Sequence, residues 1–418
     1  MRKILEKIIL KRLNKFIHDN TLLRPEKCGF RNQHITSHQL LRVVESITRG
    51  FNEHRSTGAL FIDIEKAFDS EGLLYKLIKL GIPDGLTNIL GSYLTNRHFR
   101  VQIDSHKSQW KQIRAGVPQG SLLGPVLFNL YINAIPQTDG TEIGMYADDT
   151  TFLTQSWQPK LAHHKLQNAI LKAEEWFKKW RMNVNASKCV ALFFTKRAKH
   201  KPPSQLQIDG HKIPWAPSVK YLGVYLDCRL NWDCHIRETI KKARAHLLRL
   251  YPLINRTSKL SLQAERDIYL MLLRPVLTYS SPVWGHAAAS KINRLQVDQI
   301  KLLRMIAHAH RATRLTTLHE DMKVPMMKSQ IRSLAQRFYD KIRCVDNPLI
   351  NALGQPHTSS EKYKRPISLL GLTITHHPER VTNRSTEILQ NCTNRTHLYT
   401  WPPLQKKTTN KFKKINKN

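Results

Sequence analysis

The chain has 418 residues, of which 41% are hydrophobic and 8% aromatic, so it is long enough for two or three domains and apolar enough to bury a core. That composition excludes an intrinsically disordered protein. Lys and Arg number 67 against 31 Asp and Glu, and the net charge of +36 favours an anionic partner. Nucleic acid fits such a charge because each phosphate contact releases counterions, whereas a merely soluble basic protein is the plainer alternative.

The first 20 residues predict an amphipathic helix. Ile4, Ile8 and Leu13 recur at helical spacing, and Lys7 and Lys11 interrupt the apolar runs. These interruptions exclude a signal peptide, and no stretch reaches the roughly 20 apolar residues of a membrane span. We therefore expect an intracellular protein, nuclear and cytoplasmic, that is not secreted and contacts no membrane.

The next two hundred or so residues alternate between the two periodicities of regular structure. Helices are expected at residues 40–47, 73–94 with a break near 81–83, 122–135 and 165–181. Strands are expected at residues 58–63, 99–103 and 110–113 (as a hairpin), 143–146, 150–153, 190–195 and 221–226.

Beyond residue 227 the apolar pattern becomes mostly helical, at residues 235–254, 260–280 and 290–310. From about residue 347 the periodicity is lost, and the chain ends in a basic run that predicts a disordered tail. The expected order is a mixed sheet domain, a helical domain and a basic tail.

Acidic residues stand where two apolar segments end. Asp63 closes the strand at 58–63, and Asp148 and Asp149 form the tip of a tight hairpin. A buried or paired carboxylate calls for a cation, and two metal ions about 3.5–4 Å apart are what phosphoryl-group chemistry uses. Taken singly, each signal has a plainer reading, because Asp-Asp is common in solvated turns and Asp is a common helix cap.

A glycine-rich loop lies between these acidic segments. Gly116 and Gly120 permit close backbone approach to a ligand, Pro118 stiffens the loop, and the Gln119 amide can donate and accept hydrogen bonds. The alternative is an ordinary strand-to-helix turn, for which the same residues suffice.

Three motifs in this order carry a resemblance to a known family: FIDIEKAFD at 61–69, AGVPQGSLLGPVLFNLYIN at 115–133 and YADD at 146–149. They closely resemble the reverse transcriptases of non-LTR retrotransposons, and the jockey-like elements of insects look closest. Supporting matches are CGFR at 28–31, AEEWFKKWRMNVNASKC at 173–189 and VKYLGVYLD at 219–227. The resemblance runs from near residue 3 to about residue 350.

The resemblance implies an RNA-directed DNA polymerase, a nucleotidyltransferase that adds dNTPs to a DNA primer 3′-hydroxyl on an RNA template by two-metal chemistry. The metal would be Mg²⁺, with Mn²⁺ possible. The implied catalytic residues are the carboxylates Asp63, Asp148 and Asp149, and the implied metal site consists of these three together with Ile64. Nucleotide contacts are implied for Phe68 (beneath the sugar), Pro118, Gln119, Gly120 and Lys188, and primer contacts for Tyr221, Leu222 and Gly223. For Phe68 ordinary core packing stays open, and for Lys188 a plain surface position.

The implied fold class is α+β, a right-hand polymerase palm of antiparallel sheet and helices with partial fingers and a helical thumb. The expected divisions are partial fingers at 1–55, palm and fingers at 56–227, thumb at 228–315 and a C-terminal extension at 316–418. Relatives carry a preceding fingers segment and a few more residues after Ser70, so the resemblance also implies an N-terminally truncated chain. Two alternatives follow: a catalytically impaired remnant that only binds nucleic acid, and a host RNA-binding protein that has lost catalysis.

Overall fold

The structure is a computed structural model that describes residues 2–64, 69–113, 116–118, 120–255, 257–355, 357–358, 361–371 and 373–374. Residues Met1–Thr373 form one compact unit. The expected C-terminal tail lies outside the described residues from 375 on, and so do two expected site residues, Phe68 and Gln119.

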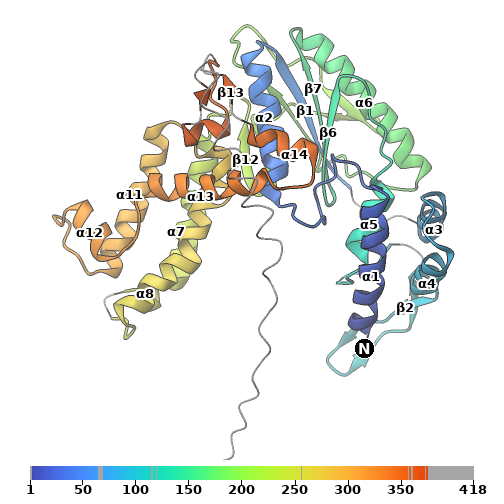
Figure 1. The fold of residues 1–418 in the computed structure, drawn as a ribbon, viewed down its shortest axis with the longest axis horizontal. Coiled ribbons are helices and arrows are strands. Elements are labelled where there is room, and N and C mark those ends of the chain that lie inside the picture. The colour runs from blue at the N-terminus through green and yellow to red at the C-terminus, as the bar shows by residue number, and fades with distance from the viewer. Residues whose placement is uncertain are drawn as a thin grey trace, which may run out of the picture. The chain divides into compact units, whose positions relative to one another are not determined.

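A four-stranded antiparallel sheet stands at the centre of this unit (Figure 1), in the order β6-β7-β1-β8. Its strands are β6 (Thr141–Tyr146), β7 (Asp149–Ser156), β1 (Ser56–Asp63) and β8 (Val190–Phe194). Successive side chains of a strand point to opposite faces. Leu60 and Ile62 of β1 accordingly belong to one hydrophobic core, whereas Ala59 and Phe61 belong to another.

Helices cover both faces of the sheet. Helix α2 (Thr36–Asn52) packs on the face that carries Phe61, while α6 (Pro159–Lys179) and α5 (Gly124–Ile132) join the core on the face that carries Leu60. Figure 1 shows α2 and α6 on opposite sides of β1 and β7. The α+β class with an antiparallel sheet is therefore confirmed.

The remaining elements flank this centre. The other helices are α1 (Arg2–Asp19), α3 (Ser70–Lys79), α4 (Asp84–Leu94), α7 (Asp233–Leu250), α8 (Leu262–Ile268), α9 (Arg274–Thr278), α10 (Ser281–Trp284), α11 (Ala289–Ile306), α12 (Leu315–Asp321), α13 (Met327–Ile342) and α14 (Pro348–Asn351), with short 3-10 turns η1 (Tyr251–Leu253), η3 (Ala352–Gly354) and η4 (Pro366–Leu370) and a π-helical turn η2 (Tyr269–Leu273). The other strands are β2 (Arg97–Phe99), β3 (Gln102–Ile103), β4 (His106–Lys107), β5 (Lys111–Ile113), β9 (Leu206–Ile208), β10 (His211–Ile213), β11 (Ser218–Tyr221), β12 (Val224–Asp227), β13 (His357–Thr358) and β14 (Thr373–Ile374).

The single strand expected at 221–226 is wrong. The chain forms a hairpin there, in which β11 and β12 pair and Leu222 and Gly223 make the turn at φ 44° and 83°. The hairpin expected at 99–113 is present, with β2 paired to β5 and a second small hairpin of β3 and β4 at its tip.

The described helices from α7 to α13 share a hydrophobic core with the sheet. Their buried residues, among them Ile236, Trp284 and Tyr339, belong to the same hydrophobic cluster as Leu40 of α2 and Phe61 of β1. Within the part of the chain that the structure describes, no helix is long and apolar enough to cross a membrane.

Candidate active site

Three acidic residues meet where β1 ends and β7 begins. In the antiparallel register Asp63 lies directly opposite Asp149. Tyr146 pairs with Asp149 across the β6–β7 hairpin, so Ala147 and Asp148 form its two-residue turn. Ala147 adopts the left-handed conformation with φ 55°, which such tight turns require. The turn therefore holds Asp148 at the exposed tip, beside the end of β1.

The three carboxylates act on one another electrostatically. The pKa of Asp149 is raised to about 6, first because burial disfavours its charged form and then because Asp148 and Asp63 repel its charge. Carboxylates placed this close together are an oxygen-donor set suited to a divalent cation. Yet within the described ranges no three His, Cys, Asp or Glu side chains already form a metal-binding group.

Lys188 lies at this cluster. Its Nζ is 3.1 Å from Oδ2 of Asp63 in an ion pair whose lysine side chain is 59% exposed. The backbone N–H of Asn185 donates to the carbonyl of Asp63, and Ile64, next along the chain, bridges to Val184. The loop that precedes β8 thus binds the end of β1 and brings a cation to the carboxylates.

The glycine-rich loop is held from outside by side chains of other elements. Glu6 of α1 accepts from the backbone N–H of Leu122 at 2.9 Å, and Tyr93 of α4 donates to Oγ of Ser121 at 2.7 Å. Gly120 is exposed with φ 73°, and Pro118 is half-buried. The loop is therefore fixed at its helical end and open around Gly120.

The expected primer-binding residues lie on the β11–β12 hairpin. The Tyr221 side chain is buried, with its ring 4.9 Å from that of Phe61 and its hydroxyl accepting from Gln39 Nε2 at 3.2 Å. The Leu222 carbonyl accepts from the Tyr279 hydroxyl at 3.0 Å. Tyr221 thus anchors the hairpin in the core, Leu222 is half-buried against that core, and Gly223 is exposed.

One residue at the site was not predicted from the sequence. Lys27 is fully buried, and its Nζ donates to the carbonyl of Ala147 at 2.9 Å, at the turn that carries Asp148. The matched motif began one residue later, at Cys28. Because a buried lysine leaves no mark in hydrophobic periodicity, only its place beside that motif could have pointed to it.

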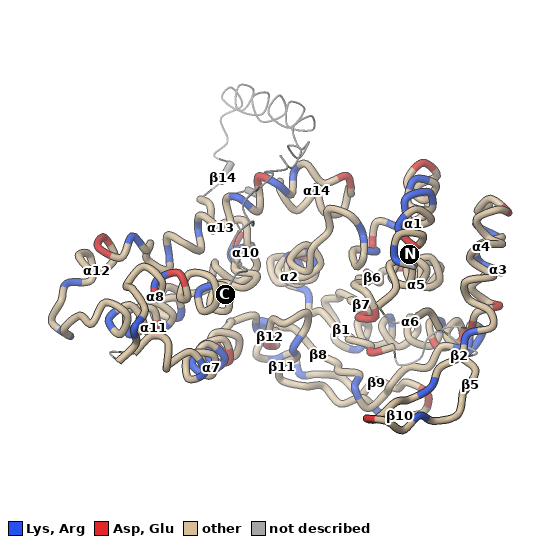
Figure 2. The backbone as a smooth tube through the Cα atoms, turned by 90° about the horizontal axis from the view of Figure 1, so that it is seen from below, with Lys and Arg blue, Asp and Glu red and all other residues tan. Residues whose placement is uncertain are grey.

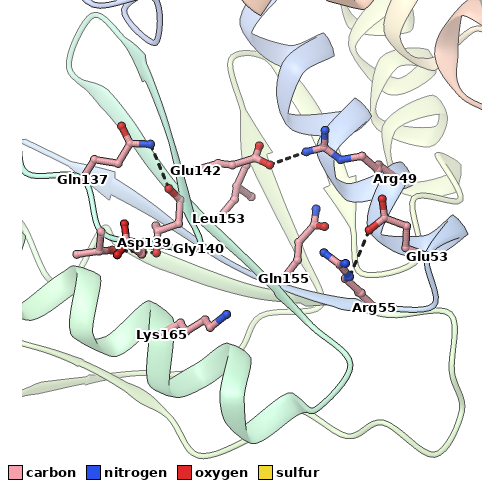
Figure 3. A pocket seen from close by; sticks show the side chains of 12 residues that line it. Arg49, Glu53, Arg55, Gln137, Asp139, Gly140, Glu142, Leu153, Gln155 and Lys165 are labelled. Carbon is pink, nitrogen blue, oxygen red and sulfur yellow. Dashed lines mark hydrogen bonds and ion pairs between the residues drawn. The ribbon is translucent and has the colours of Figure 1, made fainter.

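A pocket of about 810 Å³ lies elsewhere (Figure 3). It lies between the C-terminal part of α2 and Lys165 of α6. Figure 3 shows Arg49 turned toward Glu142 and Arg55 toward Glu53. Those pairs are 2.6 and 3.2 Å apart, so the arginines are already engaged by acids. The pocket therefore offers no surplus positive charge to a nucleotide.

The raised pKa of Asp149 leads to a prediction about stability. Because its folded pKa of about 6 exceeds the ordinary 3.8, this group stabilises the fold fully below about pH 4 and loses that contribution as pH rises through 6. We expect Asp149→Asn, measured in EDTA, to raise the Tm at pH 7.5 by about 1–3 °C. The difference should disappear near pH 4, where the wild-type carboxyl is also neutral. An equal difference at both pH values would contradict this electrostatic origin.

The chain is similar to several known proteins. The family model described as "Reverse transcriptase (RNA-dependent DNA polymerase)" matches residues 1–226. The RNA-directed DNA polymerase from mobile element jockey of Drosophila melanogaster is 35% identical over 363 residues, 84% of this chain and 39% of that protein. The probable RNA-directed DNA polymerase from transposon X-element of the same species is 34% identical over 361 residues, again 84% of this chain and 39% of that protein. This chain thus spans about two fifths of the length of these relatives.

Among solved structures, apo telomerase from Candida tropicalis matches with a TM-score of 0.37 and 10% identity, covering 75% of this chain and 60% of that one.

Proposed function

Since this chain belongs to the reverse transcriptase (RNA-dependent DNA polymerase) family, we propose that it is an RNA-directed DNA polymerase of a non-LTR retrotransposon, which transfers nucleotides from dNTPs to a DNA primer on an RNA template. The observation that carries the proposal is that Asp63, Asp148 and Asp149 lie together where β1 ends and β7 begins. Carboxylates from two separate motifs, brought together by strand register, are what two-metal nucleotidyl transfer needs.

The proposed metal set is Asp63, Ile64, Asp148 and Asp149, with Mg²⁺ as the ion and Mn²⁺ as a substitute. A divalent ion there would offset the repulsion among the carboxylates and supply charge stabilisation to the reacting phosphate. Lys188 supports the assignment, because its 3.1 Å ion pair with Asp63 brings a positive charge to where a triphosphate would lie.

The remaining site residues complete the proposal. The nucleotide would contact Phe68, Pro118, Gln119, Gly120 and Lys188, and the primer end would meet Leu222 and Gly223, with Tyr221 fixing their hairpin. The proposed divisions keep residues 56–227 as the palm and fingers and 228–315 as the thumb. The core shared by β1 and the thumb helices implies that palm and thumb fold together.

Primer extension tests the proposal directly. The chain is incubated with a DNA primer on a homopolymeric RNA template, Mg²⁺ and the complementary dNTP, and Asp63→Asn serves as the control for contaminating polymerase. Primer extension by the wild-type chain that is absent with Asp63→Asn supports the proposal. Tight template binding with no extension, in Mg²⁺ or Mn²⁺, would instead support the nucleic-acid-binding remnant.

Nucleic-acid binding is predicted to depend steeply on salt. Figure 2 shows Lys and Arg positions on α1, α7, α11 and α13, and α7 exposes Lys241, Lys242 and Arg249. The logarithm of affinity should fall by roughly 0.9 per phosphate contact for each tenfold rise in salt. Replacing those α7 residues with Ala should reduce the slope by about 1 for each phosphate that is no longer neutralised, as fluorescence anisotropy would measure. An unchanged slope would show that α7 does not bind the nucleic-acid backbone.

A further inference from the structure

Lys27 is joined to the turn between β6 and β7 by its side chain and by its neighbours' backbone. Its exposed fraction is 0%, and Nζ donates to the carbonyl of Ala147 at 2.9 Å. Lys27 also forms an isolated parallel bridge with Met145: the Cys28 N–H donates to the Met145 carbonyl at 2.9 Å, and the Met145 N–H donates to the Glu26 carbonyl at 3.2 Å. This short segment therefore runs beside β6 as far as the turn.

The turn needs such support because of its conformation. Ala147 has φ 55°, a left-handed backbone that is uncommon for residues other than glycine, and it directly precedes Asp148. A strained residue of this kind persists only when its surroundings hold it. The carbonyl of Ala147 accepts the hydrogen bond from Lys27, so this bond restrains the strained residue itself.

The surroundings of Lys27 leave its amine little else to bind. Nζ lies 5.2 Å from the centre of the Phe128 ring, and burial lowers the pKa of Lys27 to about 7. A buried amine without a partner is costly, so moving the Ala147 carbonyl away from Nζ carries a penalty in either protonation state. The neutral amine still donates a hydrogen bond, so the contact with the Ala147 carbonyl persists in either protonation state. The negative charge of Asp148 also acts on the Lys27 amine.

We propose that Lys27 is a positioning residue for Asp148: by donating to the Ala147 carbonyl it fixes the turn and so the direction in which the Asp148 carboxylate points. Lys27 is fully buried, and its action on the carboxylate runs through the backbone of the turn. This inference rests on the proposed polymerase function, and it adds a group outside the motifs that carry the family resemblance.

Lys76 provides a matched control. It is 5% exposed, its Nζ donates to the Tyr131 carbonyl at 2.5 Å, and burial lowers its pKa to about 7 as well. Its amine lies 4.0, 4.4 and 3.7 Å from the ring centres of Tyr131, Trp176 and Trp180. These rings belong to α5, to α6 and to the residue that follows α6, and none of them is part of the turn. Replacing either lysine with Met removes a buried amine of similar kind and leaves a side chain of similar length.

The test compares Lys27→Met with Lys76→Met in single-turnover primer extension, with Tm measured for both. A turn displaced by about 1 Å can cost roughly 100-fold in rate. We expect Lys27→Met to lower kcat by about that factor with the KM for dNTP and the primer–template Kd changed less than about threefold, and Lys76→Met to keep kcat within about threefold. Equal losses of kcat in the two variants, or a Lys27→Met kcat within threefold of wild type, would overturn the proposal. If Lys27→Met does not fold, Lys27→Gln is measured in its place against the same limits.

A second readout separates this proposal from the polymerase function. Hydrogen–deuterium exchange of the peptide spanning residues 145–151 should speed up in Lys27→Met and stay at the wild-type rate in Lys76→Met, whether or not the chain extends a primer. Unchanged exchange in Lys27→Met would overturn the positioning role. A wild-type chain that extends no primer yet shows the expected exchange pattern would refute the polymerase function alone.

Discussion

Asp148→Asn is expected to reduce primer extension by about 10³-fold or more while primer–template binding stays within about twofold. A metal-binding carboxylate supports several kcal/mol of charge stabilisation in the transition state, and each 1.36 kcal/mol corresponds to a tenfold change in rate. The substitution keeps the size of the side chain and sits at the exposed tip of the turn, so the fold should tolerate it. Single-turnover extension and anisotropy measure the two quantities separately.

Asp209→Asn is the matched control for this experiment. Asp209 is another acid in a tight turn, between β9 and β10, where Oδ1 lies 2.8 Å from Nζ of Lys178 in an exposed ion pair. Exposed pairs of this kind contribute about 0–1 kcal/mol, so extension should stay close to wild type. An Asp148→Asn protein that extends primers as fast as Asp209→Asn would refute the assignment of Asp148 as a catalytic carboxylate.

Gly29→Ala is expected to lower extension by about 100-fold and to destabilise the fold by about 1–3 kcal/mol. A Cβ at Gly29 would lie 2.0 Å from the backbone nitrogen of Ala147 and 2.8 Å from the carbonyl carbon of Tyr146. Backbone atoms cannot rotate out of the way as a flexible side chain can, so the turn itself must move. Asn129, whose Nδ2 donates to the Gly29 carbonyl at 2.7 Å, restrains the opposite movement of Gly29.

Gly85→Ala separates this effect from the general effect of adding a methyl group. Gly85 is in helix α4, and a Cβ there would meet nothing within 4 Å. An exposed helical glycine replaced by Ala should stabilise the chain by about 0.5–1 kcal/mol and leave extension unchanged. Extension by Gly29→Ala at the rate of Gly85→Ala would show that the turn accommodates the methyl group without moving its carboxylate.

Hydrophobic periodicity predicted the elements whose pattern is strong. The strand ending at Asp63 and the break between α3 and α4 around Gly81-Ile82-Pro83 were both located from the sequence. The hairpin of β11 and β12 was missed because residues 221–226 read as one apolar run. Leu222 adopts φ 44° in the turn, a conformation that its residue type does not signal.

The candidate site divides in the same way. The meeting of Asp63 with Asp148 and Asp149 was expected from the resemblance, because carboxylates that share metal ions must converge. The pairing of β1 with β7, which places Asp63 opposite Asp149, comes from the structure. Lys27 was not expected, because its role depends on a carbonyl 120 residues away in sequence. The tertiary fold alone creates that hydrogen bond.

The position of β1 between two hydrophobic cores has a consequence for heat inactivation. Ala59 and Phe61 pack in one core, Leu60 and Ile62 in the other, and the strand between them ends at Asp63. Because a protein can open locally in cooperative units, loss of either core uncovers one side of the strand and releases its carboxylate. The half-life of activity at high temperature is then governed by whichever core opens faster. Substitutions that tighten the slower core would leave that half-life unchanged, even where they raise the free energy of global unfolding.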